Sequence, residues 1–137
     1  MPLGGINHVA FSVRDLAASS AFYDPVMAFL GYERWPAVIG QAKWKKPGVG
    51  VFLLYECKPG SRDKVHDRYA PGLHHMSFDA ESREQVDGLH RLLVERGATI
   101  LDPPAPYTYT REYYAVFFAD PDGLKLELAY TPHAYSR

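Results

Sequence analysis

Hydrophobic and polar positions alternate along residues 6–13, INHVAFSV, as they do in a half-buried strand. Residues 15–32 then carry apolar side chains at helical spacing, behind an Asp15 that can cap a helix. Because proline breaks a helix interior, Pro25 predicts one helix up to about residue 24 and a short second helix that ends at Gly31. Further strands are expected over residues 32–38, 40–46 and 49–57.

The same order of patterns begins again in the second half. Residues 73–80, LHHMSFDA, alternate like a strand, and residues 82–97 have helical periodicity. Ser82 and Gln85 have the spacing of a capping box, and Gly97 follows the last apolar position. Three more strands are expected over 98–102, 112–119 and 123–130, the last two joined by a turn with the sequence DPDG.

This repetition indicates two βαβββ modules within a single domain of residues 1–137. The modules span about 3–57 and 72–131. Residues 58–71 are polar, charged and flanked by Pro and Gly, which predicts a linker or a mobile loop. We therefore predict an α+β fold in which the two modules form curved mixed sheets. Aligning NHVAFSV with HHMSFDA places His8 on His75 and Ala10 on Ser77.

Strand alternation places each of three residues on the face of its strand opposite the apolar side. These residues are His8, His75 and Glu127. Val9, Phe11 and Val13 form the apolar side of the first strand, which leaves His8 on the other side. In the last strand, the aliphatic side likewise leaves Lys125 and Glu127 opposite. Two imidazoles and a carboxylate can hold a divalent transition metal and leave positions for substrate, so we predict these three residues as ligands. Hydrogen-bonded interior histidines and a solvated Glu127 are the alternative. His74 is expected to pack or to form a hydrogen bond behind the sheet.

Composition and charge exclude several classes of function. The chain has a net charge of -1 and no run of Lys or Arg, which argues against nucleic acid and anionic membranes as partners. A single cysteine, Cys57, excludes an intrachain disulfide framework. The sequence shows neither a secretory leader nor an apolar run near 18 residues, so a cytoplasmic protein is expected.

The segments NHVAFSV, HHMSFDA and FFADPDGLKLEL, in this order within a βαβββ repeat, resemble the vicinal oxygen chelate superfamily. That superfamily contains glyoxalase I, bleomycin- and fosfomycin-resistance proteins and ring-cleaving dioxygenases, and the resemblance covers about residues 3–131. It implies paired half-barrels with a divalent ion (Zn, Ni, Mn or Fe) held by His8, His75 and Glu127. It also implies a homodimer, in which His8 of one subunit joins His75 and Glu127 of its partner.

Two departures from the superfamily patterns narrow the expected chemistry. Glyoxalase I adds a carboxylate from the last strand of the first half. Aligning Gly50 with Gly123 sets Leu54 opposite Glu127, with Glu56 two residues further on the same face as a candidate ligand or base. Ring-cleaving dioxygenases carry a Tyr shortly before Asp-Pro-x-Gly, where this chain has Phe117, and a His where it has residues 108–110, TYT. Ring cleavage is therefore disfavoured.

Polar and aromatic side chains near the predicted cup are candidate substrate contacts. Tyr109, Arg111, Tyr113 and Lys125 can bind a polar or aromatic small molecule, although tyrosines in strands and arginines in loops are more often structural. We expect a metal-dependent lyase or isomerase of the glyoxalase type that acts on a small oxygen-chelating substrate, with Glu127 also taking part in catalysis. The alternatives are a metal-free protein that sequesters a small toxic molecule such as an antibiotic and, less favoured, a ring-cleaving dioxygenase.

Overall fold

The computed structural model describes residues 2–134. The chain divides into two compact units, Met1–Val65 and His66–Arg137, called unit 1 and unit 2 below. Their boundary falls within the polar segment 58–71. No helix among the described residues is both long enough and apolar enough to cross a bilayer.

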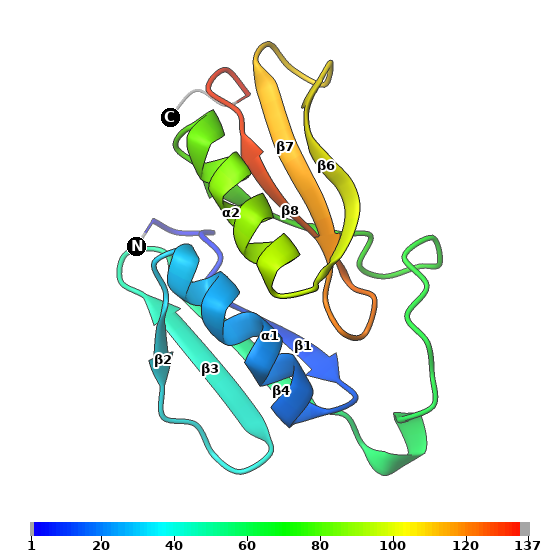
Figure 1. The fold of residues 1–137 in the computed structure, drawn as a ribbon. Coiled ribbons are helices and arrows are strands. Elements are labelled where there is room, and N and C mark those ends of the chain that lie inside the picture. The colour runs from blue at the N-terminus through cyan, green and yellow to red at the C-terminus, as the bar shows by residue number, and fades with distance from the viewer. Residues whose placement is uncertain (1, 135–137) are drawn as a thin grey trace. The chain divides into compact units, whose positions relative to one another are not determined.

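Unit 1 is a four-stranded sheet with one helix (Figure 1). Strand β1 is parallel to β4, and the remaining neighbours are antiparallel, in the order β1-β4-β3-β2. A short 3-10 turn, Pro59–Ser61, follows the last strand. The elements are β1 (His8–Val13), α1 (Leu16–Phe29), β2 (Glu33–Trp35), β3 (Gln41–Lys46) and β4 (Gly50–Glu56).

Unit 2 repeats this topology, with its strands in the order β5-β8-β7-β6 and β5 parallel to β8 (Figure 1). The predicted α+β fold of two βαβββ modules is therefore confirmed. The elements are β5 (Met76–Ala80), α2 (Arg83–Glu95), β6 (Thr99–Tyr107), β7 (Tyr113–Ala119) and β8 (Lys125–Tyr130).

In each unit, one face of the sheet is covered by the helix, and we call the opposite face the helix-free face. In unit 1, α1 buries Tyr23 and Met27 against Trp44, Phe52 and Leu54. In unit 2, α2 buries Val86, Leu89 and Leu93 on the side that also contains Leu126 and Leu128. Because strand side chains alternate, His8 and Glu127 lie on the helix-free faces of their sheets.

The predicted helix caps are present. Asp15 accepts a hydrogen bond from the Ala18 N–H at 3.0 Å, and Ser82 accepts one from the Gln85 N–H at 3.2 Å. Gly31 and Gly97 follow the two helices with φ of +84° and +69°, a left-handed conformation that glycine adopts without steric cost. The DPDG turn is also present, because Asp120 accepts from the backbone N–H groups of residues 122 and 124.

Helix α1 continues through Pro25, contrary to the prediction of two shorter helices. Proline removes one helical hydrogen bond and crowds the preceding turn, which costs about 3 kcal/mol in an isolated helix. Here Tyr23, Val26 and Met27 are fully buried on both sides of the proline. Continuing the helix keeps these three side chains in the core, and burial of each stabilises the fold by roughly 1.5–3 kcal/mol.

Three strand boundaries also differ from the prediction. Strand β2 covers only residues 33–35, and β5 begins at Met76 instead of residue 73. Strand β6 extends to Tyr107 through three prolines and contains two shifts of register. It lies at the edge of its sheet, where a strand has one side free of partners and proline is tolerated.

We predict that Tyr114→Phe destabilises the protein. The Tyr114 hydroxyl donates to Asp87 Oδ1 at 2.6 Å and ties β7 to α2, and this bond raises the pKa of the phenol. Its loss leaves the Asp87 carboxylate without this donor, so the free energy of unfolding in urea should fall by about 1–2 kcal/mol. The control is Tyr109→Phe at a side chain 68% exposed, which should change it by less than about 0.5 kcal/mol. Equal effects at both positions would contradict this role.

Candidate metal centre

The structure brings His75 and Glu127 together on the helix-free face of unit 2. Glu127 lies in the middle of β8, paired with Ser77 of β5 and Phe117 of β7, and it is only 1% exposed. His75 lies directly before β5, with Nε2 3.3 Å from Glu127 Oε2. An imidazole and a buried carboxylate therefore face one another.

This spacing fits two ligands of one metal ion. Unprotonated imidazole nitrogen and carboxylate oxygen are both acceptors, so their approach requires a proton or a cation between them. Tetrahedral ligand bonds of about 2.0–2.2 Å place neighbouring ligand atoms about 3.3–3.6 Å apart. Within residues 2–134, no three His, Cys, Asp or Glu side chains gather as a complete metal site. His75 and Glu127 are two of the three predicted ligands, and the third, His8, belongs to unit 1.

The Nδ1 atom of His75 contacts the side chain of His74. The two Nδ1 atoms lie 2.7 Å apart, and the rings meet edge to face with centroids 4.9 Å apart. Loss of solvation and the charges of His75, Lys125 and Arg68 lower the pKa of His74, which favours a neutral ring. A neutral His74 can accept the Nδ1 proton of His75, which leaves His75 Nε2 unprotonated toward Glu127.

His74 was expected behind the sheet, and the structure corrects this. Strand β5 begins only at Met76, so strict alternation of side chains does not extend back to residues 74 and 75. His74 instead contacts His75 on one side and the ring of Tyr69 on the other, with centroids 5.8 Å apart. It is a hydrogen-bond partner of the candidate ligand.

His8 shows a matching arrangement in unit 1. Its Nδ1 lies 2.9 Å from Asn7 Oδ1, and because a carbonyl oxygen only accepts, His8 Nδ1 carries the proton. Nε2 is then available as a ligand. Asn7 and His74 occupy equivalent positions of the repeat, so each candidate histidine is oriented through Nδ1 by the residue that precedes it.

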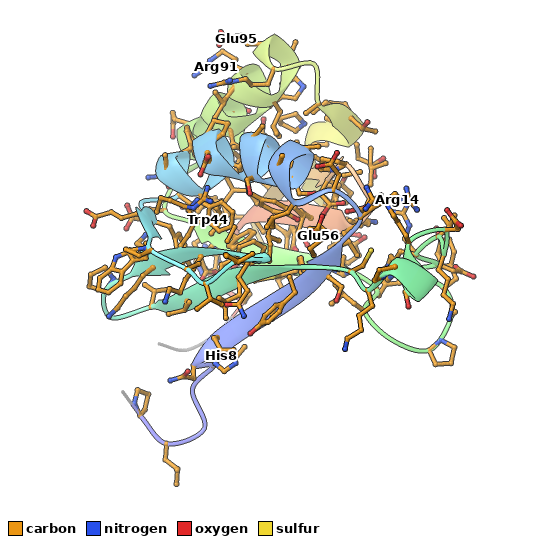
Figure 2. The ribbon with its side chains drawn as sticks, turned by 90° about the horizontal axis from the view of Figure 1, so that it is seen from below. His8, Arg14, Trp44, Glu56, Arg91 and Glu95 are labelled. Atoms are coloured by element: carbon orange, nitrogen blue, oxygen red, sulfur yellow. The ribbon has the colours of Figure 1, made fainter. Side chains whose placement is uncertain are left out.

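The strand register corrects the expected position of Glu56. Ala10 pairs with Leu53, whereas its equivalent Ser77 pairs with Glu127, so Leu53 and not Leu54 is the counterpart of Glu127. Glu56 therefore shares the alternation of Leu54, which faces α1. It also pairs with Val13, at the opposite end of β1 from His8 (Figure 2).

Two of the predicted substrate residues lie around Glu127. The Tyr113 hydroxyl donates a hydrogen bond to Glu127 Oε1. Lys125 Nζ lies 4.5 Å from the ring centre of Phe117, the residue that pairs with Glu127 across the sheet. Phe117 also contacts the His75 ring, at 6.3 Å between centroids.

Tyr109 and Arg111 lie further out along the loop between β6 and β7. The Tyr109 ring stacks on Tyr107 at 5.5 Å and meets Tyr113 edge to face. The Arg111 side chain is 78% exposed, and its nearest ionic partner is Glu112 at 3.9 Å. The structure therefore does not bring Arg111 to the candidate ligands.

Sequence reasoning missed Tyr107 as part of this site. Tyr107 pairs with Tyr113 across the sheet, and its ring meets Phe117 edge to face at 5.4 Å. Burial, followed by the charges of Asp102, Tyr109 and Glu127, raises the pKa of Tyr107, so its phenol remains a proton donor. The prolines before it suggested a loop, which concealed the strand alternation that could have identified it.

The family model described as the Glyoxalase/Bleomycin resistance protein/Dioxygenase superfamily matches residues 5–128. The chain belongs to this superfamily. The match includes both modules and all three predicted ligands, and it confirms the resemblance stated from the sequence.

Several curated proteins are similar to this chain over most of its length. The Bacillus subtilis protein YqjT is 32% identical over 124 residues, which are 90% of this chain and 96% of YqjT. The metallothiol transferase FosB of Shouchella clausii is 30% identical and covers 92% of this chain and 80% of its own. Glyoxylase I 4 of Arabidopsis thaliana is 29% identical, with 92% and 70% covered.

Solved structures of the superfamily share the fold. A candidate glyoxalase from Bacillus halodurans superimposes with a TM-score of 0.85 at 32% identity, covering 94% of this chain and 97% of its own. A glyoxylase/bleomycin resistance protein/dioxygenase domain from Frankia gives a TM-score of 0.76 at 28% identity, with 94% and 98% covered.

We predict the imidazole tautomers of this site. In the Zn²⁺-loaded protein, His8 and His75 should both carry their proton on Nδ1, because Asn7 and His74 accept it and the ion takes the place of a proton at Nε2. His74 should carry its proton on Nε2, and it serves as an internal control. Nitrogen-15 NMR of the imidazole rings distinguishes the tautomers. A predominantly Nε2-protonated His75 in the Zn²⁺-loaded protein would contradict the arrangement.

Proposed function

We propose that this chain is a metal-dependent enzyme of the glyoxalase type, a lyase or isomerase that acts on a small molecule through two neighbouring oxygens. The observation that carries the proposal is the buried Glu127 carboxylate facing His75 Nε2 at 3.3 Å. A divalent ion, Zn, Ni, Mn or Fe, would be held by His8, His75 and Glu127. These donor types suit such ions.

The chain's own residues would bind and orient the substrate beside this ion. When bound, a divalent ion supplies Lewis acidity, which stabilises negative charge on substrate oxygens. Lys125 offers a positive charge next to Phe117, and Tyr107 and Tyr109 offer aromatic surface. We assign proton transfer from the substrate to Glu127. Glu56 has no role in this site, because the alternation of side chains along β4 places it on the α1 side of its sheet.

Transfer of a thiol to a small electrophile is a second candidate function. Leu53 stands where an isomerase of the glyoxalase I type would add a carboxylate, so that position offers no second base. Thiol transfer needs a stabilised leaving oxygen but no such base. In this reaction a sulfur–carbon bond forms, a carbon–oxygen bond breaks and the thiol proton passes to the oxygen. The relatives named metallothiol transferase FosB favour this candidate.

The remaining alternatives have less support. A binding protein that only sequesters its ligand has no use for a buried carboxylate aimed at an imidazole, since that arrangement costs free energy unless it is compensated. Phe117 in place of a dioxygenase tyrosine continues to disfavour ring cleavage. Incubating metal-loaded protein with thiol adducts of α-dicarbonyl compounds, and separately with a thiol and a small electrophile, distinguishes the first two reactions.

We predict that three substitutions remove metal binding. His8→Ala, His75→Ala and Glu127→Ala each delete a proposed ligand, so metal content after purification without chelator should fall strongly. His74→Ala deletes only a hydrogen-bond partner of His75 and should weaken affinity by roughly 10- to 100-fold. Elemental analysis and titration with the metal measure both effects. Full metal content in Glu127→Ala would disprove the proposed centre.

We further propose a two-fold homodimer in which each site combines His8 of one subunit with His75 and Glu127 of its partner. The polar linker of residues 58–71 would allow the two modules of one chain to take part in different sites of the dimer. Arg14 donates to the carbonyls of Arg62 and Lys64, so the first part of the linker is anchored to unit 1.

We predict that mixing His8→Ala with Glu127→Ala protein restores metal binding in part. Subunit exchange should create one intact and one doubly damaged site in each mixed dimer. Light scattering reports the oligomeric state, and metal titration reports the recovery. A monodisperse monomer, or no recovery despite demonstrated exchange, would place all three ligands within one chain.

A further inference from the structure

We propose that Tyr113 is a positioning residue of the metal centre, whose phenol holds the Glu127 carboxylate so that only Oε2 is presented toward His75. This inference rests on the proposed metal-dependent function and extends it. It replaces the interpretation of Tyr113 as a substrate contact.

The two oxygens of Glu127 have different partners. Oε1 accepts the hydrogen bond from the Tyr113 hydroxyl, and Oε2 faces His75 Nε2 at 3.3 Å. A carboxylate held at one oxygen cannot rotate about its last bond without losing this hydrogen bond. A hydrogen bond to a charged acceptor is stronger than one between neutral groups, so this bond favours a single orientation of the carboxylate.

Small side chains create the space for the Tyr113 ring. Tyr113 lies at the start of β7, four residues before Phe117, which is the direct cross-strand partner of Glu127. The intervening pair on the same face is Ala115 and Ala129, both buried. The Tyr113 ring packs against this cluster of Ala115, Phe117 and Ala129, and so lies along the sheet toward Glu127.

Neighbouring rings fix the position of Tyr113 from the other side. Tyr107 and Tyr109 stack on one another, and each meets Tyr113 edge to face, at 6.2 Å and 5.2 Å between centroids. The backbone directly before Tyr113 is strained, because Glu112 has a φ of +59°. Such strain is found where the surrounding structure determines the backbone, often at functional sites.

The expected consequence is a ligand that is oriented before the metal binds. A phenol on Oε1 disfavours ligation through both oxygens and removes part of the negative charge from the carboxylate. Losing such a partner typically weakens metal affinity by about 10- to 100-fold. Ligand geometry should change as well, because the freed Oε1 can then approach the ion.

The test is Tyr113→Phe, which keeps the ring and its packing but removes the hydroxyl. Titration with Co²⁺ should give a dissociation constant roughly 10- to 100-fold higher than that of the unsubstituted protein. The visible absorption of the bound Co²⁺ should also change, because it reports ligand geometry. The matched control is Tyr114→Phe, the same change at the next residue, whose hydroxyl bonds Asp87 on the α2 side. It should leave both Co²⁺ readouts unchanged.

A second variant tests the same contact without deleting the hydroxyl. Ala129→Val suits a strand but adds methyl groups beneath the Tyr113 ring, which should displace it from Glu127 and weaken Co²⁺ binding in the same direction. Unchanged Co²⁺ affinity and absorption in Tyr113→Phe, alongside weakened binding in Glu127→Ala, would overturn the positioning role and leave the metal centre intact. Equal weakening by Tyr113→Phe and Tyr114→Phe would overturn it too. Unchanged binding in Glu127→Ala would instead refute the centre itself.

Discussion

The buried carboxylate of Glu127 is the constraint on which the rest of unit 2 depends. An ionised carboxylate taken out of water costs several kcal/mol unless charges and hydrogen bonds compensate it. Its strand neighbours Leu126 and Leu128 face α2, so the carboxylate must be compensated on the helix-free face. The Tyr113 phenol and the His75 imidazole reach it there, from β7 and from the start of β5. The need to compensate the buried carboxylate explains why polar groups gather on a face that also contains buried alanines and Phe117.

The two modules share a topology but have diverged in chemistry. Both orient a histidine through its Nδ1 atom by the preceding side chain, Asn7 in one and His74 in the other. Only the second module keeps a carboxylate at the position where the first has Leu53. A site with one histidine from each module and a carboxylate from one of them is therefore asymmetric with respect to the repeat. Three protein ligands of these types would leave a coordination position for substrate, which a catalytic metal requires.

Much of the fold follows from local physical signals in the sequence. The caps Asp15 and Ser82, the alternation of β1 and the aliphatic side of β8 each act within a few residues, so pattern alone identifies them. Pro25 and the prolines of β6 misled the prediction because long-range packing and an edge position outweighed their local effect. The register of β4 was wrong by one residue, since glycines near a turn do not fix strand pairing as hydrogen bonds do.

The ligand candidates were predictable and their partners were not, for a physical reason. A histidine or glutamate can be recognised as a possible metal ligand from its residue type alone, and the repeat indicates which positions are equivalent. The contact between Tyr113 and Glu127 depends instead on what is missing between them: Ala115 and Ala129 have side chains too small to block the ring. Likewise, His74 reaches His75 only because β5 begins three residues later than the pattern suggests. Groups that orient a ligand are therefore found through packing and strand ends, which a sequence pattern does not encode.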